Sequence, residues 1–375
     1  MMRVTSELLG TGKATTGARS PMCTVERTQL QRDGQPIDLL TLRNAWGMQV
    51  RFLTLGGIIV SIKVPDKHGN LADVVLGYDD LESYLHDECY FGALIGRSAN
   101  RIAGGAFELD GQSVQLSRND GSNHLHGGER GFNSVVWTAE PFERADECGA
   151  TLSYSSAAGE EGYPGTLRAR VTYTLKAAGD FVVEYHAETD SATPVNLTQH
   201  AYFNLTGLGD RDVLGHLLQV NATHFTPVGS GLIPTGEVRS VDGTPFDFTS
   251  AHPIGERIGT PDHQLQLGGG YDHNFVLSGA PSAIPTAAAH LYEPESGRVL
   301  DILTTEPGLQ VCSGNALHIG VRGRSGQPLG EYAGVALETQ HFPDAPNHPG
   351  FPTTILQSGQ HYQSQTIYRF SLTAP

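Results

Sequence analysis

The chain of 375 residues has few cysteines, few tryptophans, no long apolar run and a deficit of positive charge. Cys23, Cys89, Cys148 and Cys312 lie far apart without a Cys-x-x-Cys pair, which predicts neither a zinc site nor a disulfide framework. We therefore expect free thiols in a reducing compartment, with the cytoplasm as the location. Residues 1–22 lack the apolar core of a secretory signal, and no apolar run approaches the roughly 20 residues that cross a bilayer.

The net charge of the chain indicates which classes of molecule it can bind. The sequence has 24 Lys and Arg against 40 Asp and Glu, which gives a formal net charge of −16. Such a chain repels nucleic acid and anionic membranes, whereas a neutral small molecule is indifferent to its field. We therefore predict a small-molecule partner, no nucleic acid and no membrane.

Short alternating runs separated by turn residues are typical of sheets rather than of alternating strands and helices. Residues 167–175 and 181–188 predict one hairpin, and 107–115 and 290–304 each predict another around a turn that contains glycine. Residues 79–85 predict one short helix, and 46 Gly with 21 Pro favour turns over long helices. The expected fold is all-β, a large antiparallel β-sandwich with few short helices.

The organisation along the chain is simple. No internal repeat and no low-complexity linker follows residue 24. Residues 1–24 are predicted to be a flexible N-terminal leader, and residues 25–375 a single domain. A chain of this length has enough interior to bury a large core even with a hydrophobic fraction of 38%.

Residues 195–205 alternate between two faces, which predicts a strand. The apolar face carries Val195, Leu197, Ala201, Phe203 and Leu205. The other face carries Asn196, Thr198, His200, Tyr202 and Asn204. Strand faces in water normally carry charged side chains, so this neutral hydrogen-bonding face suits an uncharged polar ligand such as a sugar. The alternative is a neutral face whose groups bond to an adjoining sheet or loop.

Four further segments have the composition of a site. Residues 96–102 place two arginines and an asparagine after an apolar run, and residues 119–128 end in two glycines after a histidine. Residues 268–275 bring Asp272 to the start of a strand through three glycines. Glu338 lies between small residues on a short apolar strand, so we expect it to be partly buried and to need a partner or a shifted pKa. A plain turn, a surface loop or a salt bridge is the alternative for each segment.

One carboxylate and one histidine suffice for a metal-free reaction of sugars. Opening a cyclic hemiacetal needs a base that takes the proton of the anomeric hydroxyl and an acid that protonates the ring oxygen. An ionised Glu and a protonated His provide these two roles. The sequence has no Gly-x-Gly-x-x-Gly after a strand, no Walker loop and no Cys/His zinc spacing, so we predict no cofactor and no metal.

Five segments of this chain together resemble the aldose 1-epimerase family, also called the galactose mutarotase family. They are Gly-Arg-Ser-Ala-Asn-Arg-Ile at 96–102, Asn-His-Leu-His-Gly-Gly at 123–128, Pro-Val-Asn-Leu-Thr-Gln-His-Ala-Tyr-Phe-Asn-Leu at 194–205, Tyr-Asp-His-Asn-Phe at 271–275 and Leu-Glu-Thr-Gln at 337–340. They follow family order, and the resemblance continues to the C-terminus. It implies the family's galactose mutarotase-like supersandwich and the interconversion of α and β anomers of free aldoses such as galactose and glucose.

The resemblance also implies a role for each matching residue. Glu338 falls at the position of the general base, and His200 at that of the general acid. His126 matches a second histidine that binds the sugar and helps to polarise its ring oxygen. The remaining expected ligands of the sugar are Asn100, Arg101, Asp272, Gln310 and, in the same cleft, Tyr202.

Some neighbours of these residues are expected to lie outside the site. Gln199 and Ala201 depart from the residues that usually flank the acid in the family, which loosens the support of that histidine. His124, His273 and His341 each lie beside a motif residue but point the other way by alternation, so we expect them to contact solvent or core.

Two other functions fit the same residues. A glycoside hydrolase or lyase would use Asp272 and Glu338 as a carboxylate pair flanking a glycosidic oxygen, but the chain has only Trp46 and Trp137 for an aromatic cleft. A non-catalytic sugar-binding module would keep the polar strand face without needing Glu338 and His200 together.

A sugar-phosphate epimerase on the same fold would need an anion clamp, for which Arg97 and Arg101 alone are too few. The sequence does not rank the aldoses. We expect a monomer or a weak homodimer.

Overall fold

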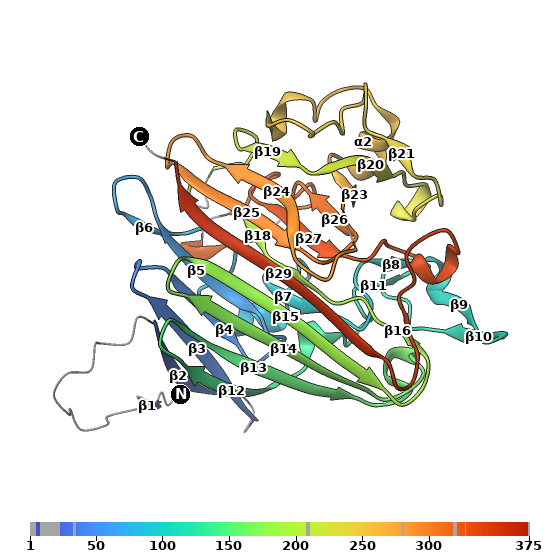
Figure 1. Ribbon diagram of the computed structural model, residues 1–375, viewed down its shortest axis with the longest axis horizontal. Coiled ribbons are helices and arrows are strands. Elements are labelled where there is room, and N and C mark those ends of the chain that lie inside the picture. The colour runs from blue at the N-terminus through green and yellow to red at the C-terminus, as the bar shows by residue number, and fades with distance from the viewer. Residues whose placement is uncertain are drawn as a thin grey trace.

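The computed structural model describes residues 5–7, 23–32, 35–207, 211–279, 281–317, 321–326 and 328–373. Within these residues the chain forms three large sheets and four two-stranded ladders, with helices α1 (Leu81–Leu85) and α2 (His263–Gly268). Figure 1 shows long strands crossing the front of the molecule, with further strands behind them. The predicted all-β fold with few short helices is confirmed.

The first sheet follows the chain order, and each strand pairs antiparallel with the next. Its strands are β1 (Thr5–Glu7), β2 (Cys23–Arg32), β3 (Gln35–Asn44), β4 (Gln49–Leu53), β5 (Ile59–Pro65) and β6 (Leu71–Asp73).

The second sheet has nine strands and forms the front of the molecule in Figure 1. In spatial order they are β12 (Thr138–Glu143), β13 (Glu147–Ser156), β14 (Leu167–Lys176), β15 (Asp180–Thr189), β29 (His361–Leu372), β25 (Arg298–Thr304), β24 (Thr286–Tyr292), β19 (Leu217–Val220) and β22 (His252–Pro253).

The third sheet and the short ladders build the candidate site. The third sheet runs β18 (Tyr202–Phe203), β27 (Val335–Gln340), β26 (Gly308–Cys312), β23 (Asp272–Leu277), β20 (Ala222–Thr226) and β21 (Arg239–Ser240). The ladders pair β7 (Ala93–Ile95) with β17 (Thr198–His200), β8 (Arg101–Ile102) with β11 (His124–Leu125), β9 (Ala106–Leu109) with β10 (Gln112–Gln115), and β16 (Thr193–Pro194) with β28 (Ile355–Leu356).

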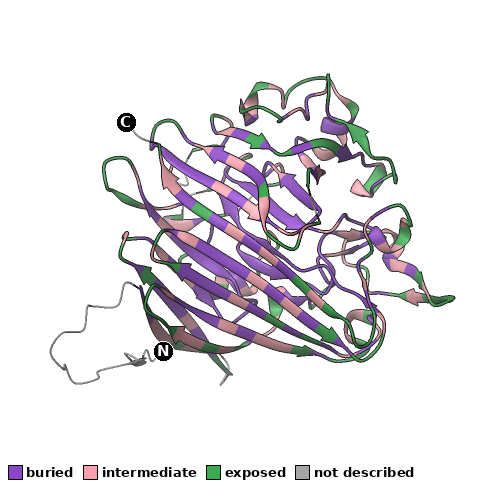
Figure 2. Cartoon of the chain, viewed as in Figure 1, coloured by how far each residue is buried: buried purple, intermediate pink, exposed green. Residues whose placement is uncertain are grey.

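Alternation along the strands builds the core. In β14 the side chains of Ala169 and Val171 are buried, whereas those of Arg168 and Arg170 are exposed. Figure 2 shows buried and more exposed residues alternating along the strands of the nine-stranded sheet. The buried face joins residues of the other two large sheets in one hydrophobic cluster. Each large apolar side chain buried there contributes about 1.5–3 kcal/mol.

The local elements largely match the sequence predictions. The three predicted hairpins are confirmed as β14–β15, β9–β10 and β24–β25. The predicted helix is α1, whose N-cap Asp80 accepts a 2.8 Å hydrogen bond from the Ser83 amide. Helix α2 was not predicted, because its short run of six residues shows no clear helical period.

The structure describes only residues 5–7, 23 and 24 of the predicted leader. Residues 1–4 and 8–22 lie outside the described residues, while Thr5–Glu7 pair with β2, so the boundary at residue 24 stays a prediction.

Nowhere in the described ranges does a helix have the length and apolar character needed to cross a membrane.

The prediction of four free thiols was wrong for two of them. Cys23 and Cys148 form a disulfide, and Cys89 and Cys312 are free. The two bonded cysteines are 125 residues apart in sequence, and contact between β2 and β13 brings them together. Sequence spacing could not reveal this packing of one sheet on another.

Removal of this disulfide by the double substitution C23S/C148S is expected to lower the free energy of unfolding by about 2–5 kcal/mol, because the bond closes a long loop. Urea unfolding measures the loss, with C89S as the control that leaves the bond intact. Thiol titration of the unfolded, unreduced chain should find the two thiols of Cys89 and Cys312. Four titratable thiols would contradict the assignment.

Candidate active site

A hollow of about 760 Å³ lies where the third sheet meets the loops around β7, β8 and β11. Seven of the predicted site residues line it: Asn100, Arg101, His126, His200, Tyr202, Asp272 and Glu338. Residues that are more than two hundred positions apart in sequence therefore share one cavity. The eighth predicted residue, Gln310, is not among the lining residues.

The strand register of the third sheet explains the place of Gln310. Gln310 on β26 lies opposite Glu338 on β27 and Asn274 on β23. Its side-chain Nε2 donates a 2.7 Å hydrogen bond to Asp272 Oδ1. Gln310 thus orients the Asp272 carboxylate from behind the cavity wall.

Residues 195–205 do not form one continuous strand as predicted. The segment divides into β17, which pairs with β7, and β18, which pairs with β27, because its two halves have different partners. Both faces are buried, and three of the five neutral polar side chains bond to backbone groups elsewhere: Asn196 to His341, Thr198 to Thr339, and Asn204 to Arg211 and Ala333. Only His200 and Tyr202 of the polar set line the hollow.

The centre of the hollow is a carboxylate–imidazole pair. His200 Nε2 lies 3.5 Å from Glu338 Oε1, and their side chains are only 6% and 3% exposed. Burial lowers the pKa of His200 to about 4. Burial, together with the nearby charge of Asp272, raises the pKa of Glu338 well above its usual value. Glu338 Oε2 has no hydrogen-bond partner among the described residues, which leaves it available to a ligand.

His126 is held in one tautomer. Its Nδ1 accepts a 3.2 Å hydrogen bond from the Asn100 amide, so the proton of the neutral ring lies on Nε2. Burial and the neighbouring His200 hold the pKa of His126 well below 6.5, which favours this neutral form. The ring therefore offers an N–H donor, and its centroid lies 5.1 Å from that of His200.

The same tautomer bears on metal binding. The candidate ligand atoms of His126, His200 and Glu338 all lie within 4.8 Å of one another, and these residue types can bind zinc. Since His126 uses its Nδ1 lone pair for the Asn100 amide and carries its proton on Nε2, it does not present a free lone pair to an ion. The cluster suits hydrogen bonding better than coordination.

Arg101 adds a positive charge at the edge of the cluster. Its Nε donates a 2.7 Å hydrogen bond to Asp120, and its charge opposes the rise in the pKa values of Asp272 and Glu338. Asn100 has a positive φ of 59°, and its Oδ1 accepts from the Arg101 amide at 2.9 Å. The loop therefore holds both side chains at the cavity wall.

The three histidines expected to point away lie outside the hollow. His124 Nε2 is 2.6 Å from the Tyr163 hydroxyl, and His273 packs against Phe246. His341 forms an ion pair with the buried Glu306, with 2.6 Å between Nδ1 and Oε2.

Sequence reasoning missed several lining residues, of which Tyr90 is the clearest. Its ring centroid lies 4.7 Å from that of His126 and 5.9 Å from that of His200. Cys312 also lines the cavity, and burial raises the pKa of its thiol. The sequence offered one signal that Tyr90 lies near the site: it directly precedes the apolar run that leads into residues 96–102.

A buried carboxylate–imidazole pair beside a fixed hydrogen-bond donor in a polar cavity suits proton transfer on a small polar molecule. Comparisons with known proteins identify the family to which the chain belongs. The family described as aldose 1-epimerase matches residues 38–369. A galactose mutarotase from Bos taurus is 42% identical over 349 residues, 93% of this chain and 95% of its own. An aldose 1-epimerase from Escherichia coli is 39% identical over 92% of this chain and 98% of its own.

A solved structure, titled galactose 1-epimerase from Lactobacillus acidophilus, covers 95% of this chain and 100% of its own with a TM-score of 0.83 and 27% identity. The chain belongs to the aldose 1-epimerase family and is an isomerase. The resemblance recognised in the sequence is confirmed at the level of family and fold.

The substitution Glu338→Gln is expected to stabilise the protein increasingly as the pH rises. Burial raises the pKa of Glu338, so the folded state binds the proton more tightly than the unfolded state. The resulting stability is present below the unfolded pKa of about 4.5 and is lost as the pH rises toward the folded value. Glutamine does not titrate and escapes this loss.

Thermal unfolding of both proteins across a pH series measures the effect. The exposed Glu237→Gln serves as the control, in which no growing gain is expected. A difference between Glu338→Gln and the unmodified protein that does not change with pH would count against a raised pKa.

Proposed function

We propose that this chain interconverts the α and β anomers of free aldoses, galactose and glucose among them, with Glu338 as general base and His200 as general acid. The observation that carries the proposal is the buried pair, 3.5 Å apart, in a cavity of about 760 Å³. A base and an acid this close can act on the two oxygens bonded to one anomeric carbon.

The proposed steps balance in protons and electron pairs. Glu338 takes the proton of the anomeric hydroxyl, the freed pair forms the C1=O1 double bond, and the C1–O5 bond breaks as His200 protonates the ring oxygen. Rotation about C1–C2 turns the other face of the aldehyde toward O5. The reverse proton transfers then close the ring as the opposite anomer.

Burial of the pair tunes it for this chemistry. A raised pKa makes the Glu338 carboxylate a stronger base, and a lowered pKa makes protonated His200 a stronger acid. Ring opening leaves both groups uncharged, and desolvation favours the uncharged forms. The environment thereby lowers the free energy of the open-chain intermediate relative to the ion pair.

The other lining groups are proposed to hold the sugar. The Nε2–H of His126 would donate to the ring oxygen, since its Nδ1 already accepts from backbone. The proposed ligands of the sugar hydroxyls are Asn100, Arg101, Asp272 and Tyr202, with Gln310 acting on Asp272.

Two alternatives have less support. A sugar-phosphate epimerase would need free cations, but the Arg97 guanidinium donates to backbone carbonyls of Ser156, Ala157 and Gly165, and Arg101 is paired with Asp120. For a polysaccharide hydrolase, neither tryptophan lines the cavity. Trp137 is buried in the core, and Trp46 packs at its edge.

We further propose a cytoplasmic enzyme that acts as a monomer or weak homodimer. Its strongly negative charge supports a small-molecule partner over nucleic acid. The Cys23–Cys148 disulfide argues for an oxidising compartment instead. Alkylation of thiols before cell lysis distinguishes the two, since a reduced pair supports the cytoplasm.

Polarimetry of freshly dissolved α-galactose and α-glucose tests the activity. The protein should speed the decay of rotation to the same endpoint. No acceleration with either sugar would favour a binding module.

Loss of either proton-transfer group should reduce turnover far more than sugar affinity. Glu338→Gln and His200→Asn are each expected to lower kcat by about 100- to 10,000-fold while sparing much of the affinity, because each removes one acid–base partner. The exposed Glu237→Gln and His224→Asn are matched controls outside the cavity. Near-normal rates in both site variants would refute the assigned roles.

The pH profile should have an unusually low acid limb. The active pair holds one proton, and a second proton binds only as the pH falls to the lowered pKa of His200, about 4. We therefore expect kcat/KM to stay level through mildly acidic pH and to fall near pH 4. An acid limb near 6.5, with circular dichroism showing an intact fold, would disagree with a desolvated histidine.

A further inference from the structure

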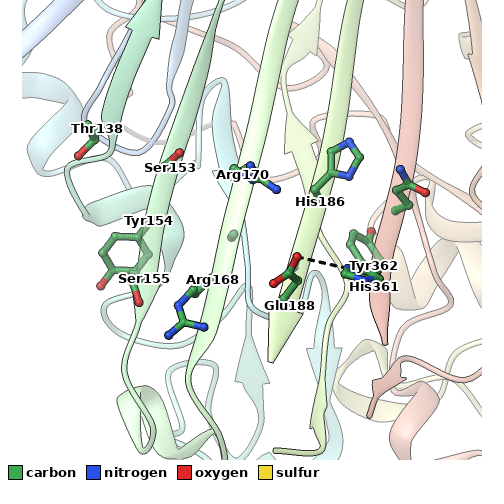
Figure 3. A pocket seen from close by; sticks show the side chains of 13 residues that line it. Thr138, Ser153, Tyr154, Ser155, Arg168, Arg170, His186, Glu188, His361 and Tyr362 are labelled. Atoms are coloured by element: carbon green, nitrogen blue, oxygen red, sulfur yellow. Dashed lines mark ion pairs between the residues drawn. The ribbon is translucent and has the colours of Figure 1, made fainter. Parts of the chain in front are cut away.

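A second hollow, of about 750 Å³, lies on the outer face of the nine-stranded sheet. Figure 3 shows its lining side chains on β12, β13, β14, β15 and β29. It shares no lining residue with the candidate active site and is nearly as large. The reaction proposed above uses none of its residues.

The strand register places an uninterrupted polar row across this hollow. Arg170 on β14 lies opposite Ser153 on β13 and His186 on β15, and His186 lies opposite Gln363 on β29. Thr138 on β12 completes the row opposite Ser153. The row thus combines hydroxyl, guanidinium, imidazole and amide groups and contains no carboxylate.

Arg168 lies two residues before Arg170 on the same face of β14. Among the described residues, neither guanidinium group forms a hydrogen bond or an ion pair, although this chain has a net charge of −16. Arg369, on the outer face of β29, differs because its Nε and Nη2 bind Asp180 at 2.9 and 3.0 Å. Arg170 therefore has no such partner in the described part of the chain, while the charge of Arg168 interacts with that of Asp190.

Two carboxylates at the Arg168 end of the hollow also contact other groups. Glu188, opposite Arg168 in the register, lies 3.3 Å from His361 Nδ1, as Figure 3 marks. Asp190 accepts a 2.7 Å hydrogen bond from the Thr166 amide. Acidic side chains are thus present at one end of the hollow, but none lies in the row of Arg170.

The chemistry of the lining favours an anion over a neutral sugar. The two lining tyrosines donate their hydroxyls elsewhere, Tyr154 to Glu160 and Tyr362 to Glu306. Arginines at i and i+2 of one strand have Cα atoms about 7 Å apart, within reach of one tetrahedral ion for such long side chains. The planar guanidinium group also matches the oxygens of a phosphate.

We propose that this outer hollow binds the phosphate group of a small molecule, with Arg168 and Arg170 as the main ligands and His186 and Ser153 as supporting ones. The ligand is either inorganic phosphate or a phosphate monoester, which share this chemistry. The site is separate from the active site, because the two hollows are lined by different sheets and share no residue.

Isothermal titration of the full chain with inorganic phosphate, at constant ionic strength, tests the site. Binding is expected, and R168Q/R170Q should weaken it by about tenfold or more, because hydrogen bonds to charged groups are lost. R369Q removes a positive charge from the same sheet face outside this hollow and should leave the affinity within about twofold. Mutarotation by R168Q/R170Q should remain normal, which shows that the variant is folded.

Two further titrations locate the ion and identify its source. Saturating galactose should leave phosphate binding unchanged if the ion binds outside the active site. Galactose 1-phosphate that binds more tightly than inorganic phosphate identifies a monoester ligand, and equal affinity identifies the free ion. Absence of phosphate binding, or equal affinity in the unmodified protein and R168Q/R170Q, overturns the proposal.

Discussion

Desolvation of the His200–Glu338 pair is the constraint on which the candidate site depends. In water a carboxylate and an imidazole have pKa values about two units apart, and the charged pair is the stable form near neutral pH. Burial raises one value and lowers the other, so the uncharged pair gains stability relative to the charged pair. This shift favours a reaction that passes through uncharged Glu338 and uncharged His200.

The pair stays buried only if the segments that form the cavity wall are held rigidly in place. The polar groups behind the cavity supply this support by binding backbone where strands end. Asn196 and His341 exchange hydrogen bonds between the start of the 195–205 segment and the end of β27, and the His341–Glu306 ion pair anchors that end. These buried polar residues therefore hold neighbouring segments together rather than contacting the ligand.

Some polar residues bond to backbone and others line the cavity, and this difference limits how far the sequence could predict the site. Alternation correctly placed His200 and Tyr202 together, because side-chain direction follows local backbone geometry. It could not distinguish them from Asn196, Thr198 and Asn204, whose side chains bond to the backbone of other segments. The same limit hid the Cys23–Cys148 bond and the hydrogen bond from Gln310 to Asp272, since both depend on packing or register between remote segments.

The alternation of β14 shows why one framework can carry two separate sites. Ala169 and Val171 face the core, while Arg168 and Arg170, one residue away on either side of Ala169, face the outer hollow. Because neighbouring residues of a strand point to opposite faces of the sheet, β14 carries two arginines on its outer face without interrupting the core on its inner face.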